Sequence, residues 1–435
     1  MITITQPQKI VLIGAGSLQF GLGAAGSILH SSILEGSTIT LHDINPEHLE
    51  LVHQACQSAI DKESLDYQLE STINREEALK DATFVINSIE IGPRFELWDQ
   101  DLHIPHWYGN RQVFGENGGP GGLFHSLRII PPILDICADI MKICPNAFLI
   151  NFSNPMSRIC LAIKRRFPSL KFVGLCHELG HFKMHYARML DTDLDNLEIL
   201  AGGLNHFGVV LEIKYKDSGK DAYPDIRKKG PKYLENIQLL DVSLNKFILE
   251  TYGYVPYTTD SHFGEYIHWA WDIADISGIK EFRDTYQASL RFEEDKIKRR
   301  IQKGRGAKLV RPDHERAIPI IEGILSDSNH TEISVNIPNE DIITNLPRDL
   351  VVECPAKITK EGVQGLKLGN FPRGLDALLR HQASVQDLVV EAVLQESKQL
   401  ALQALLADPV VHSTDEAQKI LEEMIKQQKE HLHLK

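Results

Sequence analysis

The chain has no long hydrophobic run, no cysteine framework and no excess of positive charge, and each absence excludes a class of protein. No apolar stretch among its 435 residues approaches the roughly 20 residues that span a bilayer, which argues against a membrane partner. The six cysteines lie far apart in the chain, which favours a reducing compartment where most of them act as small buried hydrophobic residues. A formal charge of −13 at pH 7 argues against nucleic acid as a partner.

Other familiar signatures are also missing. The amino terminus, MITITQPQK, has no basic segment followed by an apolar core, so we expect no signal peptide and a cytoplasmic protein. There is no internal repeat and no low-complexity linker, so we expect two parts that share an interface rather than two independent units. The chain also contains neither a CxxC nor an HExxH motif, so spacing alone gives only weak evidence for a metal site.

A glycine turn close to the amino terminus is the first feature with chemical content. Residues 10–13 form a short apolar run typical of a buried parallel strand, and Gly14, Gly16 and Ser17 follow it directly. A strand, a glycine turn and a helix start together form a cradle for phosphate, because the helix amino terminus offers free N–H groups. Gln19 occupies the position of the pattern's third glycine, so an ordinary tight turn remains the alternative.

An acidic residue at the end of the next predicted strand favours the nucleotide interpretation. Residues 38–41 form that strand, and Asp43 follows it where an NAD-type cofactor's ribose hydroxyls are bound. Further short apolar strands are expected at 83–88, 147–152 and 172–175, separated by helical segments. This alternation predicts an α/β protein with a Rossmann-type domain. Asn87, at the end of one strand, either faces the nicotinamide ribose or caps the strand, and Asn151 has the corresponding position on the next strand.

The segment from Arg94 to Gly122 shows no clean periodicity, and we expect a long functional loop there. Its five aromatic side chains argue against disorder. It ends in GENGGPGG, a run that requires sharp backbone turns. Glu116 inside this run is either a catalytic carboxylic acid or a solvated turn residue.

Polar side chains gather just after later strands. Asn154 precedes a proline at the carboxyl edge of the sheet, which is the ligand side of an open α/β sheet. Cys176 and His177 follow the next strand, and Asn205 and His206 follow about thirty residues later. A thiolate and imidazoles suit a borderline divalent metal, and the alternative is a buried cysteine with two structural histidines.

A third cluster, from Asp260 to Tyr266, is flanked by aromatic residues and is either a site wall or a polar surface loop. The chain ends, from Leu375 to His431, in what we expect to be a pair of long amphipathic helices. The second of these begins with the capping sequence from Ser413 to Glu416.

Seven motifs in order, GAGS, HDIN, GENGGPGG, NFSNP, GLCHE, GLNHF and DSHFGEY, resemble glycoside hydrolase family 4, the NAD- and divalent-metal-dependent glycosidases. The stretch VNIPNEDIITNLPRDLVVECPA also resembles that family, so the similarity covers nearly the whole chain. The resemblance implies a Rossmann-type NAD-binding domain related to lactate and malate dehydrogenases, which we assign to residues 1–200. It also implies a second α/β domain for substrate, metal and oligomerisation, assigned to residues 201–435, in a homodimer or homotetramer.

The resemblance also implies roles for single residues. Cys176 and His206 would hold the metal, usually Mn²⁺, and Asp260 would be the base near C2 of the sugar. Tyr266 is the alternative base, because phosphorylated-sugar members use tyrosine. Glu116 would be the acid, although many members carry aspartate there.

The substrate contacts implied by the resemblance are Asn154 and His177, with Arg94 and Asn205 beside them. The implied reaction is an exception to hydrolysis by two carboxylates. NAD⁺ oxidises C3, the C2 proton is removed, the aglycone is eliminated, water adds, and NADH returns the hydride. NAD is therefore regenerated in every turnover, and no net redox change is expected.

The substrate class follows from the CHE motif, which resembles the α-galacturonidase-like, non-phosphorylated members of the family. We therefore expect an α-glycoside with an anionic group at C6, a uronide or a sulfoquinovoside. Arg94, His181, Lys183 and His262 are candidate cations for that group. A neutral α-glucoside or α-galactoside is the first alternative, and a metal-free 2-hydroxy-acid dehydrogenase is the second.

Overall fold

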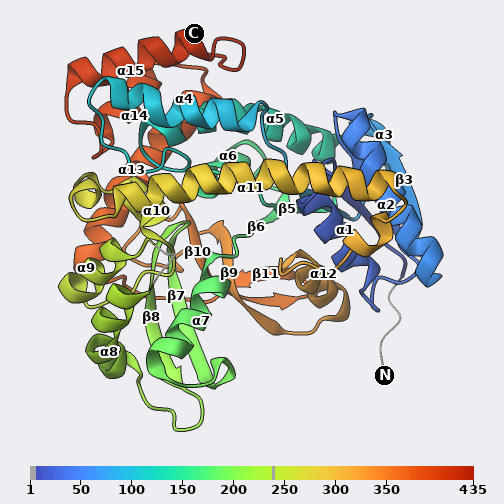
Figure 1. The fold of residues 1–435 in the computed structure, drawn as a ribbon, viewed down its shortest axis with the longest axis horizontal. Coiled ribbons are helices and arrows are strands. Elements are labelled where there is room, and N and C mark those ends of the chain that lie inside the picture. The colour runs from blue at the N-terminus through green and yellow to red at the C-terminus, as the bar shows by residue number, and fades with distance from the viewer. Residues whose placement is uncertain (1–5, 238–240) are drawn as a thin grey trace.

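The computed structural model describes residues 6–237 and 241–435, and within them an eleven-stranded mixed sheet forms the centre of the molecule (Figure 1). Residues 1–5 lie outside the described residues, and they belong to the amino-terminal segment for which we expect no signal peptide. The strand order is β3-β2-β1-β4-β5-β6-β9-β10-β7-β8, and β11 pairs with β10. The strands are β1 (Lys9–Ile13), β2 (Thr38–His42), β3 (Gln68–Thr72), β4 (Phe84–Asn87), β5 (Phe148–Asn151), β6 (Lys171–Gly174), β7 (Leu197–Leu204), β8 (Phe207–Tyr215), β9 (His330–Pro338), β10 (Val351–Thr359) and β11 (Gly362–Gly365).

The first six strands form a parallel unit. β1 pairs with β2 on one side and with β4 on the other, so the strand order reverses between β1 and β4. In an open α/β sheet a ligand binds at this reversal, beyond the carboxyl ends of the strands. The core strands read as continuous apolar runs because helices cover both faces. The predicted α/β, Rossmann-type fold is confirmed.

The later strands extend the same sheet in antiparallel fashion. β9 joins β6 through the pair Gly174 and Asn336, and β10 links β9 to the β7–β8 hairpin. The predicted boundary at residue 200 falls inside β7. The division into domains at 1–200 and 201–435 stays a prediction, since the sheet runs through both parts.

Helices surround the sheet, and in Figure 1 the long α11 crosses the width of the molecule from α10 to α2. No helix within the described ranges is long and apolar enough to cross a membrane. The helices are α1 (Phe20–Leu29), α2 (Pro46–Glu63), α3 (Arg75–Leu79), α4 (Arg94–Trp107), α5 (Gly119–Ile143), α6 (Met156–Arg166), α7 (Glu178–Leu190), α8 (Tyr223–Asn236), α9 (Ser243–Tyr252), α10 (Asp260–Phe263), α11 (Ile276–Gln302), α12 (Ala317–Ser326), α13 (Arg373–Leu394), α14 (Lys398–Ala407) and α15 (Thr414–Gln427), with 3₁₀ turns η1 (Leu194–Asn196), η2 (Gly264–Tyr266), η3 (His268–Asp272) and η4 (Gly306–Leu309).

The expectation of a long loop from Arg94 to Gly122 is wrong, because α4 occupies its first half and α5 begins at Gly119. The helical period is hidden in the sequence because α4 buries a charged residue together with its apolar ones. Asp101 lies in the interior and forms an ion pair of 2.6 Å with Arg128 of α5. The polar and apolar faces of α4 are therefore mixed. Only the segment 108–118, which carries Glu116, lies outside both helices.

The carboxyl-terminal region holds three helices, α13 to α15, where we expected a pair. The extra break is marked by Ser397, whose hydroxyl accepts a hydrogen bond of 3.2 Å from the Leu400 N–H and begins α14. The predicted cap of the last helix is confirmed, since the Ser413 hydroxyl accepts from the Glu416 N–H at 3.1 Å.

Candidate active site

The glycine turn and Asp43 are in direct contact at the carboxyl edge of the parallel strands. The Gly16 N–H donates to Asp43 Oδ2 at 2.8 Å. A Cβ built on Gly16 would lie 2.7 Å from Asp43 Cγ, so only glycine permits this approach. Asp43 Oδ1 also accepts from the Asn45 N–H at 2.8 Å, which holds the carboxylate at the edge. The predicted cofactor residues Gly14, Gly16, Ser17 and Asp43 thus form one unit.

The glycine missing at Gln19 is replaced two residues later. A Cβ on Gly21 would lie 2.1 Å from the Ala15 carbonyl oxygen, so Gly21 provides the close packing of helix on strand. The N–H groups of Leu18 and Gln19 donate no hydrogen bond within the described chain, which leaves them available to an anion before α1.

Asn87 and Asn151 connect the ends of β4 and β5. The Asn87 side-chain amide donates to Asn151 Oδ1 at 2.9 Å, and the Asn151 amide donates to the Ser153 carbonyl at 3.0 Å. Asn87 Oδ1 is buried and has no hydrogen-bond partner among the described residues. A buried unpaired acceptor at a ligand edge fits a donor supplied from outside, such as a ribose hydroxyl.

Cys176 and His206 come together, as predicted. Cys176 follows β6, His206 lies in the turn between β7 and β8, and Cys176 Sγ is 3.3 Å from His206 Nε2. Burial lowers the pKa of His206 well below its usual value, so the imidazole is neutral and able to bind a metal. Burial and two nearby carboxylates raise the pKa of Cys176, and a bound divalent cation would favour the thiolate instead.

The described residues contain no cluster of three or more metal-binding side chains. The Cys176–His206 pair therefore provides two donors and leaves the other positions open. Such an open set suits a metal that also binds a substrate. Both the donor chemistry and the open positions fit a divalent ion.

Glu353 on β10 is a site residue that the motifs did not predict. It is 1% exposed, and its Oε2 accepts from the Asn205 side-chain amide at 3.0 Å. Its other oxygen accepts from the Ser334 hydroxyl. Burial raises the pKa of Glu353 to about 7. A charged residue within the apolar strand VVECPA is the sequence signal that would have identified it. Asn205, predicted to bind substrate, has its amide engaged by this carboxylate.

His262 and Tyr266 lie on the other side of His206. The His262 ring stacks on the His206 ring at 4.4 Å between centroids, with 18° between the planes. The Tyr266 hydroxyl is 3.4 Å from the Asn205 carbonyl oxygen. Most of the Asp260–Tyr266 segment is buried, so the alternative of a polar surface loop is wrong, and its role as a site wall stays a prediction.

Asp260 is fully buried and both its oxygens are engaged by main chain. They accept from the N–H groups of Leu244, at 2.6 Å, and Asn245, at 3.0 Å, at the start of α9. Burial raises the pKa of Asp260 to about 7. Asp260 thus stabilises the amino end of α9, in addition to any role as a base.

Glu116 lies in the turn before α5 and is paired with Arg94. The Arg94 guanidinium is 3.7 Å from Glu116 Oε1 and 3.9 Å from Glu90 Oε2. The Glu116 side chain is 13% exposed, so the alternative of a solvated turn residue is wrong. These residues line a small polar pocket together with His125 and Arg128.

Asn154 and His177 are less constrained than the other predicted residues. Asn154 precedes Pro155 across a cis peptide bond, and its side chain makes no hydrogen bond within the described chain. His177 begins α7, and its Nδ1 is 3.2 Å from Glu315 Oε1. That hydrogen bond raises the pKa of His177.

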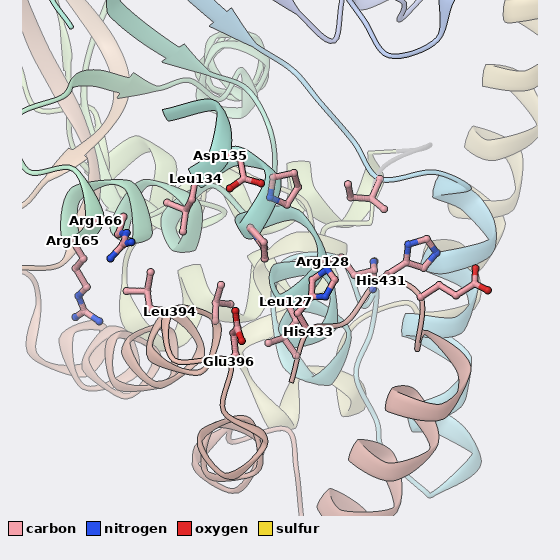
Figure 2. Close-up of a pocket in the computed structure, with 15 residues that line it drawn as sticks. Leu127, Arg128, Leu134, Asp135, Arg165, Arg166, Leu394, Glu396, His431 and His433 are labelled. Atoms are coloured by element: carbon pink, nitrogen blue, oxygen red, sulfur yellow. The ribbon is translucent and has the colours of Figure 1, made fainter. Parts of the chain in front are cut away.

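A larger cavity of about 700 Å³ lies outside this site, between α5, α6, α13 and the carboxyl-terminal tail. Figure 2 shows Arg165 and Arg166 at one end of it and Arg128 and His431 at the other. It shares Ile91 and Arg128 with the small pocket around Glu116. None of the residues predicted for the site lines this cavity.

Two family models match the chain. Residues 9–192 match the family 4 glycosyl hydrolase model, and residues 201–411 match the model of its C-terminal domain. An alpha-glucosidase from Erwinia rhapontici is 45% identical over 97% of this chain and 98% of its own length. An alpha-galacturonidase from Thermoanaerobacter italicus is 28% identical over 98% of this chain and 97% of its own.

Solved structures agree on the fold. A 6-phospho-alpha-glucosidase from gut microorganisms, in complex with NAD and Mn²⁺, superimposes with a TM-score of 0.84 at 22% identity, covering 99% of this chain and 100% of that one. The malate dehydrogenase of Cryptosporidium parvum has a TM-score of 0.54 at 14% identity, covering 90% of this chain and all of that one, so it shares the fold alone. From both family models and the long match to a glucosidase, the chain belongs to glycosyl hydrolase family 4 and is a glycoside hydrolase.

Proposed function

We propose that the protein is an NAD- and divalent-metal-dependent α-glycosidase. The observation that carries this proposal is the Cys176–His206 pair beside the dinucleotide edge of the sheet. A main-chain hydrogen bond links the metal pair to the dinucleotide edge, because the N–H of Leu175, next to Cys176, donates to the Asn151 carbonyl at 3.0 Å. The NAD and Mn²⁺ of the 6-phospho-alpha-glucosidase structure support both cofactors.

Gly16, Asp43 and Asn87 would hold NAD, and Cys176 and His206 would hold the metal, Mn²⁺ or another divalent ion. When bound, NAD⁺ supplies a hydride acceptor and the metal supplies a Lewis acid for sugar oxygens. The remaining chemistry consists of proton transfers by the protein's own side chains.

Two side chains are candidates for removing the C2 proton. Tyr266 lies against Asn205, the residue before the proposed metal ligand His206, although burial raises the pKa of its hydroxyl well above the usual value. Asp260 has both oxygens engaged by the N–H groups of α9. These contacts favour Tyr266 as the base, with Asp260 as the alternative. Asp260→Asn and Tyr266→Phe separate the two, because only loss of the base stops deuterium entering C2.

Glu116 would donate a proton to the departing aglycone oxygen. It has partial access to solvent, and Arg94 lies beside it. Proton donation by a positioned carboxyl contributes about 10²–10⁴-fold to such a step. Asn154, with its free side chain at the ligand edge, and His177 would contact sugar hydroxyls.

For the substrate, the contacts favour a neutral α-glucoside. Arg94, a candidate partner for an anionic C6 group, is already paired with Glu90 and Glu116. Burial lowers the pKa of His181, which disfavours its charged form. The 45% identity with the Erwinia rhapontici alpha-glucosidase supports the same choice.

A C6-anionic α-glycoside, the class expected from the CHE motif, is the second candidate. It is supported by the match to alpha-galacturonidase over nearly the whole chain. A positively charged His177, favoured by Glu315, would be its partner.

The test is hydrolysis in D₂O with Mn²⁺, NAD⁺ and a thiol. The p-nitrophenyl panel contains the α-glucoside, the α-galactoside, an α-galacturonide and a sulfoquinovoside. We expect cleavage of the glucoside first, deuterium at C2 of the product and no net NADH. Cleavage that needs neither NAD⁺ nor metal would contradict the proposal, and NADH that accumulates with substrate would indicate a dehydrogenase. Light scattering after gel filtration tests the proposed homodimer or homotetramer.

A further inference from the structure

The turn that carries Glu116 is held by one buried carboxylate. The N–H groups of Glu116 and Asn117 both donate to Glu265 Oε1, at 2.5 Å and 2.9 Å. A Cβ on Gly118 would lie 2.6 Å from the Glu265 carbonyl oxygen, so the turn packs directly on the Glu265 main chain. The His125 ring holds the far side of the turn through the Glu116 carbonyl, at 2.9 Å.

The position of Glu265 is unusual for a glutamate. Its side chain is 0% exposed, and no cation forms a close ion pair with it among the described residues. A buried carboxylate is costly unless hydrogen bonds compensate it, and the two N–H groups of the turn provide them. Burial raises the pKa of Glu265 to about 7, and the hydrogen bonds from the turn oppose that shift.

The second oxygen of Glu265 faces the metal side. It has no hydrogen-bond partner within the described chain, and it lies 4.0 Å from His262 Nδ1, which also has no hydrogen-bond partner there. His262 stacks on His206, and Tyr266 is the next residue in the chain. Glu265 therefore contacts the Glu116 turn with one oxygen and faces the imidazoles of the site wall with the other.

We infer that Glu265 is a positioning residue for Glu116: it fixes the turn, and so the Glu116 carboxyl, relative to the Cys176–His206 pair. It does not touch substrate, and it acts through Glu116 alone. This inference rests on the proposed role of Glu116 as the acid of an α-glycosidase.

The test is Glu265→Gln, assayed on two α-glucosides that differ in leaving group. Methyl α-glucoside needs protonation of its aglycone, whereas the p-nitrophenyl glucoside has a good leaving group. We expect kcat to fall about 10–100-fold for the methyl glucoside and less than about threefold for the p-nitrophenyl glucoside, with KM nearly unchanged. Equal losses on both substrates would mean a general structural effect and would overturn the inference.

A double-mutant cycle gives the second measurement. In a Glu116→Gln background, Glu265→Gln should cause no further loss on methyl α-glucoside, because its only route of action is gone. A further loss of the full single-mutant size would overturn the inference. Should Glu265→Gln fold poorly, Glu265→Asp replaces it in the same cycle, with the same expected lack of further loss.

The matched control is Glu416→Gln. Glu416 on α15 is also a buried glutamate that accepts a main-chain N–H, from His412 at 2.9 Å. Its other oxygen accepts from the Asn110 side chain at 2.6 Å, so it contacts the start of the segment between α4 and α5 but not the N–H groups of Glu116 and Asn117. Its kcat for both glucosides should equal that of the wild type. If Glu116→Gln itself lowers kcat equally for both glucosides, the acid role of Glu116 is wrong. That outcome is distinct from a failure of Glu265 to act through Glu116.

Discussion

The cofactor edge and the metal pair differ in how they are built. The Gly16 N–H donates to the Asp43 side-chain carboxylate, and the two residues lie 27 positions apart, within the first two βα units. Cys176 and His206 depend on buried side chains from distant elements, since Glu353 holds Asn205 across 148 residues. The geometry of the cofactor edge therefore depends on the space that its glycines leave, whereas the geometry of the metal pair depends on the charge and hydrogen bonding of buried groups.

His206→Ala should break the metal side and leave the cofactor edge intact. Loss of a ligand removes the Lewis acid, so we expect kcat/KM to fall about 1,000-fold or more. Mn²⁺ binding, followed by electron paramagnetic resonance, should disappear, and NAD binding, followed by fluorescence, should persist. Loss of both together would mean that the two regions are one cooperative unit.

Glu353, on the metal side, should contribute to the pH dependence of stability. Burial raises the pKa of Glu353 to about 7 from the usual 4.5 of a glutamate, so between these pH values the folded state binds a proton that the unfolded state releases. The contribution of Glu353 to the free energy of unfolding should therefore be largest at low pH. It should fall by up to about 3 kcal/mol as the pH rises to 7.

Urea unfolding of the metal-free protein from pH 4.5 to 8 measures this effect, with Glu353→Gln as the comparison. The variant should lack that part of the fall. An identical slope in both proteins would show that Glu353 does not carry the proton.

Gly16→Ala should affect the cofactor edge alone. The new Cβ would press on the Asp43 carboxylate, and we expect the Kd for NAD to rise about 10–100-fold, or about 1–3 kcal/mol. Isothermal titration gives the Kd, and Mn²⁺ binding should not change. Gly180→Ala is the control, because a Cβ on Gly180 meets nothing within 4 Å.

Asn45→Ala should have the smallest effect. Asn45 Oδ1 accepts from the Glu47 and His48 N–H groups at 3.1 Å and caps α2 directly after Asp43. Its loss should lower the free energy of unfolding by about 1 kcal/mol, measured by urea, with kcat unchanged. Ser413→Ala, which removes the cap of α15, should cost a similar amount. A large loss of NAD affinity in Asn45→Ala alone would show that the cap also positions Asp43.

Much of the cofactor edge could be predicted because its signals are local. The apolar run of β1, the glycine turn and Asp43 are read from consecutive residues, and even the glycine missing at Gln19 was supplied by nearby Gly21. α4 could not be predicted, because its buried Asp101 is explained only by Arg128 on another helix.

The parallel strands and the phosphate turn follow from the sequence, because apolar runs and the glycine turn are local signals. The pairing of Cys176 with His206 was implied by the family resemblance, and it depends on the antiparallel β7–β8 hairpin that carries His206. The contacts of the buried carboxylates, in contrast, are known only from the tertiary structure. Asp260 caps α9, Glu353 holds Asn205 and Glu265 holds the Glu116 turn. The reason is that a carboxylate's role depends on the N–H groups and charges that packing brings to it from distant parts of the chain.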